Sequence, residues 1–256
     1  MADHHQEVLL VGSSQESELL ALDAASGATL FTFKQVRSSS GGVAVLPRTG
    51  HVAVAQSGKL AVHLLAFGKD VPALKCHVAE PLGPLTASRC GSFLFGGARS
   101  GKVYVWEVAT GELALVFDAH YKAVAALALS DDDALLVTGG EDAVVHIWSL
   151  NGKQSLYTVS CPASVTCCLA DALEQRLFLG AGDGKIYGVD LHAAAARATA
   201  SAARIASADG SNAWASGGGD RAAPEAFEGH ETAVTALQVD ATGARLVSGD
   251  DSGGVR

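Results

Sequence analysis

Residues 118–149 read DAHYKAVAALALSDDDALLVTGGEDAVVHIWS, and they contain three short runs of alternating apolar residues separated by turn signals. The runs cover residues 123–129, 135–138 and 144–149, and the turns between them are rich in Asp and Gly. Alternation with a period of two is typical of half-buried β-strands, and Asp and Gly favour the tight turns that connect such strands. This stretch therefore predicts a small antiparallel sheet.

The same arrangement recurs along the chain. Trp148 stands near the end of the third run, and its counterparts elsewhere are Trp106, Val189, Leu65 and Leu22. Neighbouring positions in this series are 43, 41, 42 and 41 residues apart. A period of about 40–45 residues, with one four-stranded blade in each repeat, is typical of WD repeats. We therefore expect an all-β fold, a WD-repeat β-propeller with about five complete blades plus a partial one, in an incompletely closed ring.

The composition divides the chain into three parts. Residues 1–191 are expected to form blades 1 to 5. Residues 192–222 are rich in Ala, Ser and Gly and have few large apolar groups, so we expect a flexible insertion there. Residues 223–256 are expected to supply the last strand of blade 5 and a sixth blade, which is cut off before its third strand because the chain ends at Arg256.

Blade 4 contains a set of four polar residues whose chemistry suits a buried hydrogen-bond network. An imidazole can bond both a carboxylate and a hydroxyl, and the hydroxyl can accept from an indole N–H. These residues are His120, Thr138, Asp142 and Trp148. Their repeat context favours a structural role over a catalytic one, in which Thr138, His120 and Asp142 would act as nucleophile, base and orienting group. Partial equivalents in other blades are Trp106, Asp183, His230 and Ser248, and counting from blade 4 puts Ser252 at the Asp142 position of blade 6.

The overall composition excludes several classes of protein. Hydrophobic residues make up 48% and charged residues 18%, so a sizeable core can form. The net charge of −9 argues against a strong nucleic-acid clamp, although direct nucleic-acid contact stays open. The five cysteines lack metal-ligand spacing and indicate reduced thiols, so we expect no cofactor and no metal site. The start has no signal-peptide pattern, and no apolar run approaches the ~18 residues of a membrane span.

Three stretches show a closer resemblance. They are GKVYVWEVATG at residues 101–111, His120-Tyr121, and IWSL at residues 147–150. Together they resemble the WD-repeat subunit of the Rix complex, a family that includes plant root-initiation-defective-like proteins and acts in maturation of the large ribosomal subunit. The resemblance covers about residues 7–191 and 223–256. The chain departs from the family in lacking one blade between blades 4 and 5 and in being truncated at its C-terminal end.

The resemblance implies a non-catalytic protein-interaction scaffold in pre-60S assembly and rRNA processing. Its implied partners are the protein subunits of a Rix-type complex, a midasin-type AAA ATPase and the pre-60S particle, without a membrane. It further implies a location in the nucleolus and nucleoplasm, with the cytoplasm as a further location, and a link to DNA replication.

Two alternatives stay open at this point. One is another WD-repeat adaptor, either a ubiquitin-ligase substrate receptor or a chromatin-complex subunit. The other is a propeller hydrolase with a site in a central channel. The second is disfavoured because the innermost strand of blade 4, residues 123–129, is wholly apolar.

Overall fold

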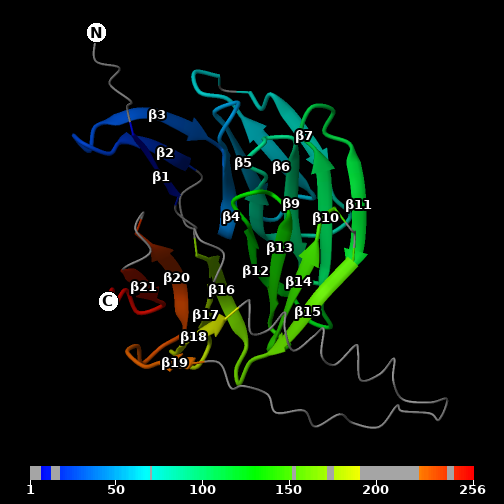
Figure 1. Ribbon diagram of the computed structural model, residues 1–256. Coiled ribbons are helices and arrows are strands. Elements are labelled where there is room, and N and C mark those ends of the chain that lie inside the picture. Colours follow the sequence, from blue (N-terminus) through cyan, green and yellow to red (C-terminus); the bar gives the residue numbers. More distant parts are fainter. Residues whose placement is uncertain are drawn as a thin grey trace, which may run out of the picture. The chain divides into compact units, whose positions relative to one another are not determined.

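The computed structural model describes residues 7–12, 18–69, 71–151, 154–171, 176–190, 225–240 and 245–256, and these residues form strands and turns without a helix (Figure 1). The chain divides into two compact units, Met1–Leu127 and Ala128–Arg256. The expected insertion at residues 192–222 lies outside the described residues, so its boundaries stay a prediction.

The first unit contains three antiparallel sheets in which strands follow one another in chain order. The first sheet has three strands: β1 (Val8–Gly12), β2 (Glu18–Asp23) and β3 (Thr29–Lys34). The second has four: β4 (Ser38–Leu46), β5 (His51–Gln56), β6 (Ala61–Leu65) and β7 (Leu74–His77). The third also has four: β8 (Leu82–Ala87), β9 (Phe93–Ala98), β10 (Lys102–Glu107) and β11 (Leu113–Asp118).

The boundary between the units falls within β12, the first strand of the next sheet. That sheet consists of β12 (Val124–Leu129), β13 (Leu135–Gly140), β14 (Val144–Ser149) and β15 (Gln154–Ser160). The following sheet consists of β16 (Val165–Ala170), β17 (Arg176–Ala181), β18 (Ile186–Asp190) and β19 (Glu225–Phe227). A two-stranded sheet of β20 (Val234–Val239) and β21 (Leu246–Asp250) comes last. The expected all-β fold built from successive four-stranded antiparallel sheets is confirmed.

Strand register shows that the recurring position found in the sequence is the same structural site in each sheet. The residue at this position, which we call the knob, faces an apolar residue of the preceding strand. It lies on the third strand of each four-stranded sheet and on β2 of the three-stranded sheet. The pairs are Trp106 with Leu94, Trp148 with Leu136, Val189 with Leu177, Leu65 with Val52, and Leu22 with Leu9. In three sheets the register to the next strand shifts at the knob, at Val105/Trp106, Ile147/Trp148 and Ala21/Leu22.

The core of the first unit lies between the faces of consecutive sheets. One buried cluster joins the first and second sheets through Leu19, Phe33 and Val54. A second cluster joins the second and third sheets and includes Leu46 and Trp106. Because the side chains of a strand alternate between its two faces, a sheet in this position buries both faces. This explains why the second strands β5 and β9 are almost completely buried.

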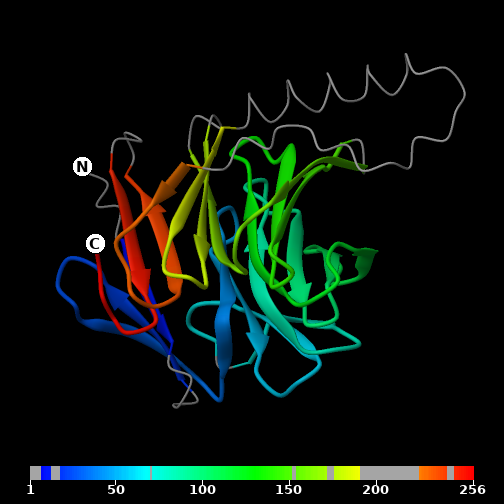
Figure 2. The same cartoon turned by 90° about the horizontal axis from the view of Figure 1, so that it is seen from below.

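In the second unit, the first strands of consecutive sheets are neighbours. β16 lies beside β20 and also contacts β13. Figure 2 shows the two-stranded sheet, coloured orange to red, beside the sheet of β16 to β18 in yellow. The sheets of β16 and β20 therefore pack through their first strands.

The turn that follows the second strand is built alike in four sheets. Its third residue has a positive φ and donates its N–H to a carbonyl three residues earlier. These residues are Gly101, Ala143, Gly184 and Gly253, with φ values of 89°, 61°, 80° and 87°. Glycine adopts this conformation readily, whereas an L-residue with a Cβ is strained by about 1–2 kcal/mol there. Ala143 is thus a strained residue at a glycine position.

We predict that Ala143→Gly stabilises the protein by about 0.5–1 kcal/mol, because the relieved strain exceeds the entropic cost of glycine in the unfolded chain. Thermal melting of the variant beside the parent chain measures this. Gly101→Ala is the matched opposite change and should destabilise, since an added Cβ at residue 101 would also collide with the carbonyl oxygen of His120. A lower melting temperature for Ala143→Gly would contradict the assignment of strain.

Candidate functional site

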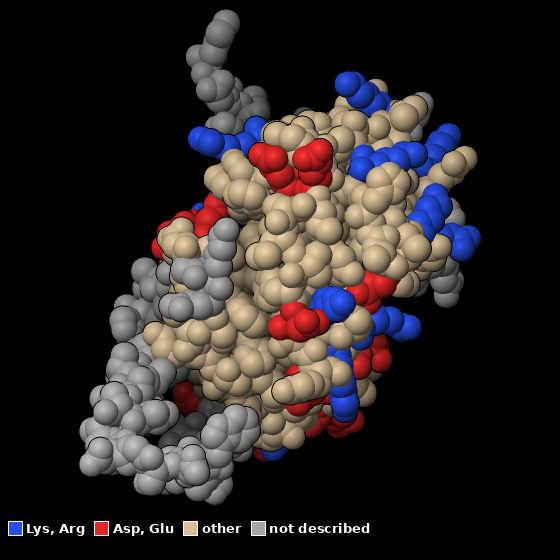
Figure 3. Space-filling model, turned by 90° about the vertical axis from the view of Figure 1, so that its right-hand side faces the viewer, with Lys and Arg blue, Asp and Glu red and all other residues tan. Residues whose placement is uncertain are grey.

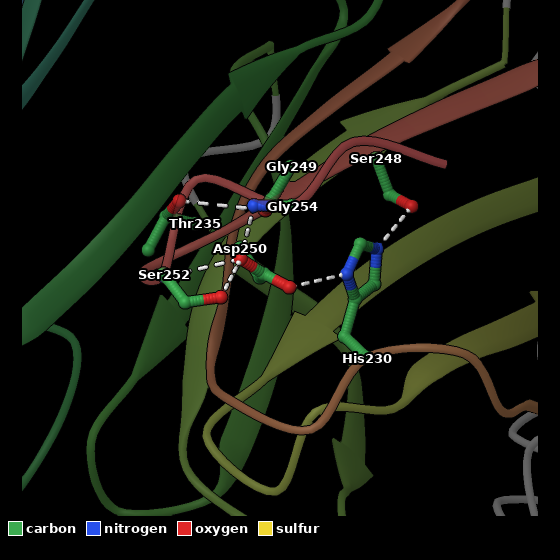
Figure 4. Close-up of polar contacts among 7 residues, drawn as sticks. All are labelled: His230, Thr235, Ser248, Gly249, Asp250, Ser252 and Gly254. Carbon is green, nitrogen blue, oxygen red and sulfur yellow. Dashed lines mark hydrogen bonds and ion pairs between the residues drawn. The ribbon is translucent and has the colours of Figure 1, made fainter.

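His230 lies four residues before β20, in the segment that leads into this strand. Its side chain connects that segment, which we call the approach, to β21. Its Nδ1 lies 2.8 Å from Asp250 Oδ2, and its Nε2 lies 2.7 Å from Ser248 Oγ (Figure 4). The side chains of His230 and Asp250 are only 2% and 7% exposed, and Ser248 is buried as well. The three residue types match those of a hydrolytic triad, but a nucleophile must contact its substrate. A hydroxyl enclosed in this way holds the sheet together instead.

Asp250 also organises the turn that follows β21. Its Oδ1 accepts hydrogen bonds from Ser252 Oγ at 2.7 Å, from Ser252 N at 3.0 Å and from Gly254 N at 2.7 Å. The Ser252 hydroxyl, followed by His230, lowers the pKa of Asp250 to about 2. Counting from blade 4 led to Ser252, so sequence reasoning missed Asp250. The carboxylate stands two residues earlier, and Ser252 is one of its donors.

Blade 4 shows part of the expected network. Trp148 Nε1 donates to Thr138 Oγ1 at 3.0 Å, and Asp142 Oδ1 accepts from the backbone N–H of Val144 at 3.2 Å. His120 is buried and belongs to the first compact unit, whereas the other three residues belong to the second. The complete four-residue network therefore stays a prediction.

Blade 3 lacks both the His and the hydroxyl. By register, its His position is held by Val78 and its Thr138 position by Gly96. The indole of Trp106, which is fully buried, donates instead to the carbonyl oxygen of His77 at 3.4 Å.

The carboxylate of blade 3 comes from Glu80, which precedes β8. It accepts from Ser100 Oγ at 2.7 Å, from Ser100 N at 3.2 Å and from Tyr104 OH at 2.9 Å. Burial raises the pKa of Glu80, but the hydrogen bonds from Ser100 and Tyr104 outweigh it and leave the pKa below its usual value. The turn between β9 and β10 is thereby fastened to the approach to β8 without a histidine.

Blade 5 uses a related solution. Val165 pairs with Ala181 as Val234 pairs with Asp250, so the residue four positions earlier, Cys161, occupies the His230 place. Asp183 Oδ2 accepts from Tyr187 OH at 2.6 Å. Burial, and then the nearby Asp183 carboxylate, raise the pKa of the Cys161 thiol to about 11. Burial, and then the hydrogen bond to Asp183, raise the pKa of Tyr187 to about 12.

Tyr104 and Tyr187 stand at the same place in their sheets, two residues before the knobs Trp106 and Val189. In blades 3 and 5, which lack the His, a tyrosine of the third strand thus donates to a carboxylate at the turn or at the approach to the first strand. Sequence reasoning missed both tyrosines. The signal that reveals them is their common spacing from the knob, once the position is compared between blades.

We predict that Tyr104→Phe and Tyr187→Phe each destabilise the protein by about 1 kcal/mol, because each removes a hydroxyl that donates to a carboxylate from a buried tyrosine. Chemical denaturation measures the loss. Tyr157→Phe is the matched control: Tyr157 lies on the outer strand β15, where water can replace a lost bond, so it should change stability less. Equal stability losses in all three variants would show that the two tyrosines do not fasten their sheets.

The charged groups do not form a continuous basic surface on the face drawn in Figure 3. Lys and Arg lie there in small groups with Asp and Glu between them, and most of the face consists of uncharged residues. Within the described ranges, no group of three His, Cys, Asp or Glu residues could hold a metal ion. The same ranges contain no helix of the length and apolar character that a membrane crossing needs.

Two family descriptions match this chain. The description WD domain, G-beta repeat, matches residues 224–256, and WDR54 matches residues 84–197. The period, the knob register and these matches together define a fold built from WD repeats.

Within the class, the chain is similar to several curated proteins. It is 33% identical to Protein ROOT INITIATION DEFECTIVE 3 of Arabidopsis thaliana over 151 residues, which cover 56% of this chain and 34% of that protein. It is 24% identical to Pre-rRNA-processing protein pro-1 of Caenorhabditis briggsae over 306 residues, which cover 96% of this chain and 55% of that protein. It is 27% identical to Pre-rRNA-processing protein IPI3 of Yarrowia lipolytica over 251 residues, which cover 78% of this chain and 57% of that protein. The resemblance to the WD-repeat subunit of the Rix complex is thereby confirmed.

The chain spans about a third to somewhat more than half the length of these relatives. The pro-1 comparison has 306 aligned positions, whereas 96% of 256 residues is about 246, so about 60 positions of that relative have no counterpart here. This difference exceeds one repeat of about 40–45 residues. The expectation that one blade of the family is missing from this chain stays a prediction.

Proposed function

We propose that this protein is a non-catalytic scaffold in assembly of the large ribosomal subunit and in rRNA processing, as part of a Rix-type complex. The observation that carries the proposal is the similarity to proteins named as pre-rRNA-processing factors in two worms and three fungi, at 24–33% identity over 147 to 306 residues. In two of them the similarity extends over 78% and 96% of this chain. It therefore covers most of the repeats and is not confined to one WD motif.

A scaffold role fits the architecture. The sheets are fastened by buried hydrogen bonds, so their loops are presented from rigid supports. The inner strands carry no Asp, Glu, Lys or Arg in β4, β8, β12 and β16, and convergent acid and base groups are what a hydrolase would need there. This argument supports binding, and not turnover, as the activity of the protein.

The proposed partners are the protein subunits of a Rix-type complex, a midasin-type AAA ATPase and the pre-60S particle. The proposed location is the nucleolus and nucleoplasm, where large-subunit precursors mature. Since the net charge is −9, recruitment to the particle is proposed to run through protein contacts, with electrostatic attraction to rRNA playing little part.

We predict that tandem affinity purification of the tagged protein co-isolates large-subunit precursor particles and two helical-repeat subunits, and that depletion accumulates rRNA precursors that retain the internal spacer. Mass spectrometry and RNA blots of the same cells measure both outcomes. A tagged WD-repeat protein of another pathway, expressed at the same level, is the control. Recovery of cullin subunits or histone-modifying enzymes, with normal rRNA processing, would establish the alternative adaptor role instead.

A further inference from the structure

β11 ends the third sheet, and its outer edge is open (Figure 1). The sheet runs in the order β11, β10, β9 and β8, and no described strand pairs with β11 on the side away from β10. The sheet has all four of its strands, and the residues before and after it form four-stranded sheets of their own. The open edge therefore does not depend on where the chain begins or ends. Backbone N–H and C=O groups along such an edge are available to another strand.

The backbone groups that face the open edge follow from the pairing of β11 with β10. Just beyond β11, Ala119 N donates to the carbonyl oxygen of Gly101 at 3.0 Å. Hydrogen-bonded pairs alternate with non-bonded pairs along an antiparallel ladder, so the next residues bonded to β10 are Phe117 and Leu115. The backbone N–H and C=O of Val116, which lies between them, therefore point away from β10 and into the open edge.

The side chains of β11 are apolar and exposed over most of its length. Leu113, Leu115 and Val116 are 49%, 43% and 37% exposed, and Ala114 is exposed as well. A strand that pairs with this edge would cover these side chains, and the burial of apolar surface would add to the main-chain hydrogen bonds.

The other described outer strands carry features that protect an edge. β7 has four residues and includes Lys75, and β19 has three residues. β3 buries Phe33 and ends at Lys34. In β15 the exposed side chains that the structure describes are serine or threonine. Short strands, lysines and polar side chains all discourage pairing with a further strand. β11 has none of these three features, so its edge is the one most suited to receive a strand.

Acidic residues flank the apolar part of β11. Glu112 directly precedes the strand, Asp118 ends it, and both are exposed. Glu107 is exposed at the end of β10, and Lys102 faces Asp118, so three acidic residues stand against one basic residue. A strand that pairs along β11 places its two ends beside these carboxylates in either direction. Opposite charges on facing residues stabilise a strand pair, so basic residues at both ends of the added strand are favoured.

We propose that the open edge of β11 binds an extended segment of a partner protein, which adds to the third sheet as a fifth strand. The segment is apolar in its middle and carries Lys or Arg at both ends. Main-chain hydrogen bonds to Val116 give affinity, and the acidic ends of β11 select the basic flanks. The inference gives the chain one specific binding surface, and it does not depend on the ribosomal role proposed above.

A second copy of this chain is a poorer occupant, because its own β11 is acidic at both ends. If two copies pair in the antiparallel direction around Leu115, Glu112 of each copy faces Asp118 of the other. If they pair around Val116, the same two carboxylates are two residues apart in register. Like charges in facing positions destabilise a strand pair, and each copy also carries a net charge of −9.

The probe for the test is a labelled synthetic peptide, KKVTVTVKK, in which an alternating run of valine and threonine lies between lysines. The control peptide has proline in place of both threonines. It keeps the charge of the first peptide but lacks two backbone donors and cannot form a regular strand pair. Fluorescence anisotropy with the full chain measures the binding of both peptides, so attraction by charge alone is distinguished from strand addition.

Two proline variants locate the site on the chain. Val116→Pro removes an N–H that faces the open edge and leaves the hydrogen bonds to β10 in place, which is where an edge strand tolerates proline. Ser160→Pro is the matched control on β15. Cys161 N donates to the carbonyl oxygen of Ala143 at 2.8 Å, so by the same alternation the N–H of Ser160 also faces outward. The melting temperatures of both variants are compared with that of the parent chain.

We expect saturable binding of the first peptide to the parent chain and to Ser160→Pro, and binding at least about tenfold weaker to Val116→Pro. Glu112→Gln with Asp118→Asn should also weaken binding at low salt, because it removes the charges that attract the lysines. Equal binding of the proline peptide, undiminished binding to the folded Val116→Pro variant or to the charge variant, or no binding to the parent chain would overturn the proposal.

A crosslinking test replaces Val116→Pro if that variant unfolds. A peptide with cysteine in place of its central valine should form a disulfide with the Ala114→Cys variant and not with Ser155→Cys on β15, as located by mass spectrometry. Absence of the link at residue 114 would overturn the proposal. A parent chain that is dimeric in analytical ultracentrifugation, and monomeric as Val116→Pro, would identify a second copy as the occupant and overturn the proposal as well.

Discussion

The structure depends on a constraint that blades 3 and 6 show most clearly: the turn that follows the second strand is fastened to the approach to the first strand. Strand pairing holds neighbouring strands together within a sheet, but it does not fix the position of the segment that leads into the first strand. A carboxylate at this place removes that freedom when it accepts hydrogen bonds from both sides. Asp250 does so with His230 and the following turn, and Glu80 does so with Ser100 and Tyr104. The bonds of Asp250 to His230 and of Glu80 to Tyr104 are partly buried, so they exclude alternative arrangements that a solvent-exposed bond would tolerate.

Different residues meet this constraint in different repeats. The His of blade 6 is replaced by Val78 in blade 3 and by Cys161 in blade 5, and in both cases a tyrosine hydroxyl becomes the donor to the carboxylate. The tyrosine can do this because its position, two residues before the knob, points toward the turn. A repeat whose motif looks degenerate can therefore keep its buried polar contacts. This explains how repeats with only partial WD motifs retain four-stranded sheets with largely buried second strands.

The fold could be predicted from the sequence because its main signal is periodic. Alternating apolar runs and an apolar knob about every 42 residues follow from burial, and burial acts on every sheet in the same way. The polar contacts are harder to predict from the sequence, since they depend on the geometry of individual turns. Counting residues led to Ser252, but the turn after β21 places the carboxylate at Asp250. Likewise, the alternation pattern of Val103–Trp106 shows that Tyr104 is a strand residue, but it gives no indication that Glu80 lies within reach of its hydroxyl. The positive φ of Ala143 was also hidden, because an alanine does not itself indicate this conformation. Only the glycines at the equivalent positions of three other sheets indicate it.

The functional argument rests on similarity, and the architecture is compatible with it. Uncharged inner strands and rigid, separately fastened sheets suit a protein that positions partners, and the relatives named for pre-rRNA processing indicate which process it serves. Both arguments require that the recurring position is the buried centre of each sheet. Amide hydrogen exchange followed by mass spectrometry tests this most directly. The account predicts that β5, β9, β13 and β17 are the slowest-exchanging segments of their repeats and that β1 exchanges as fast as the turns. Rapid exchange in those four strands, or protection of β1 equal to theirs, would contradict it.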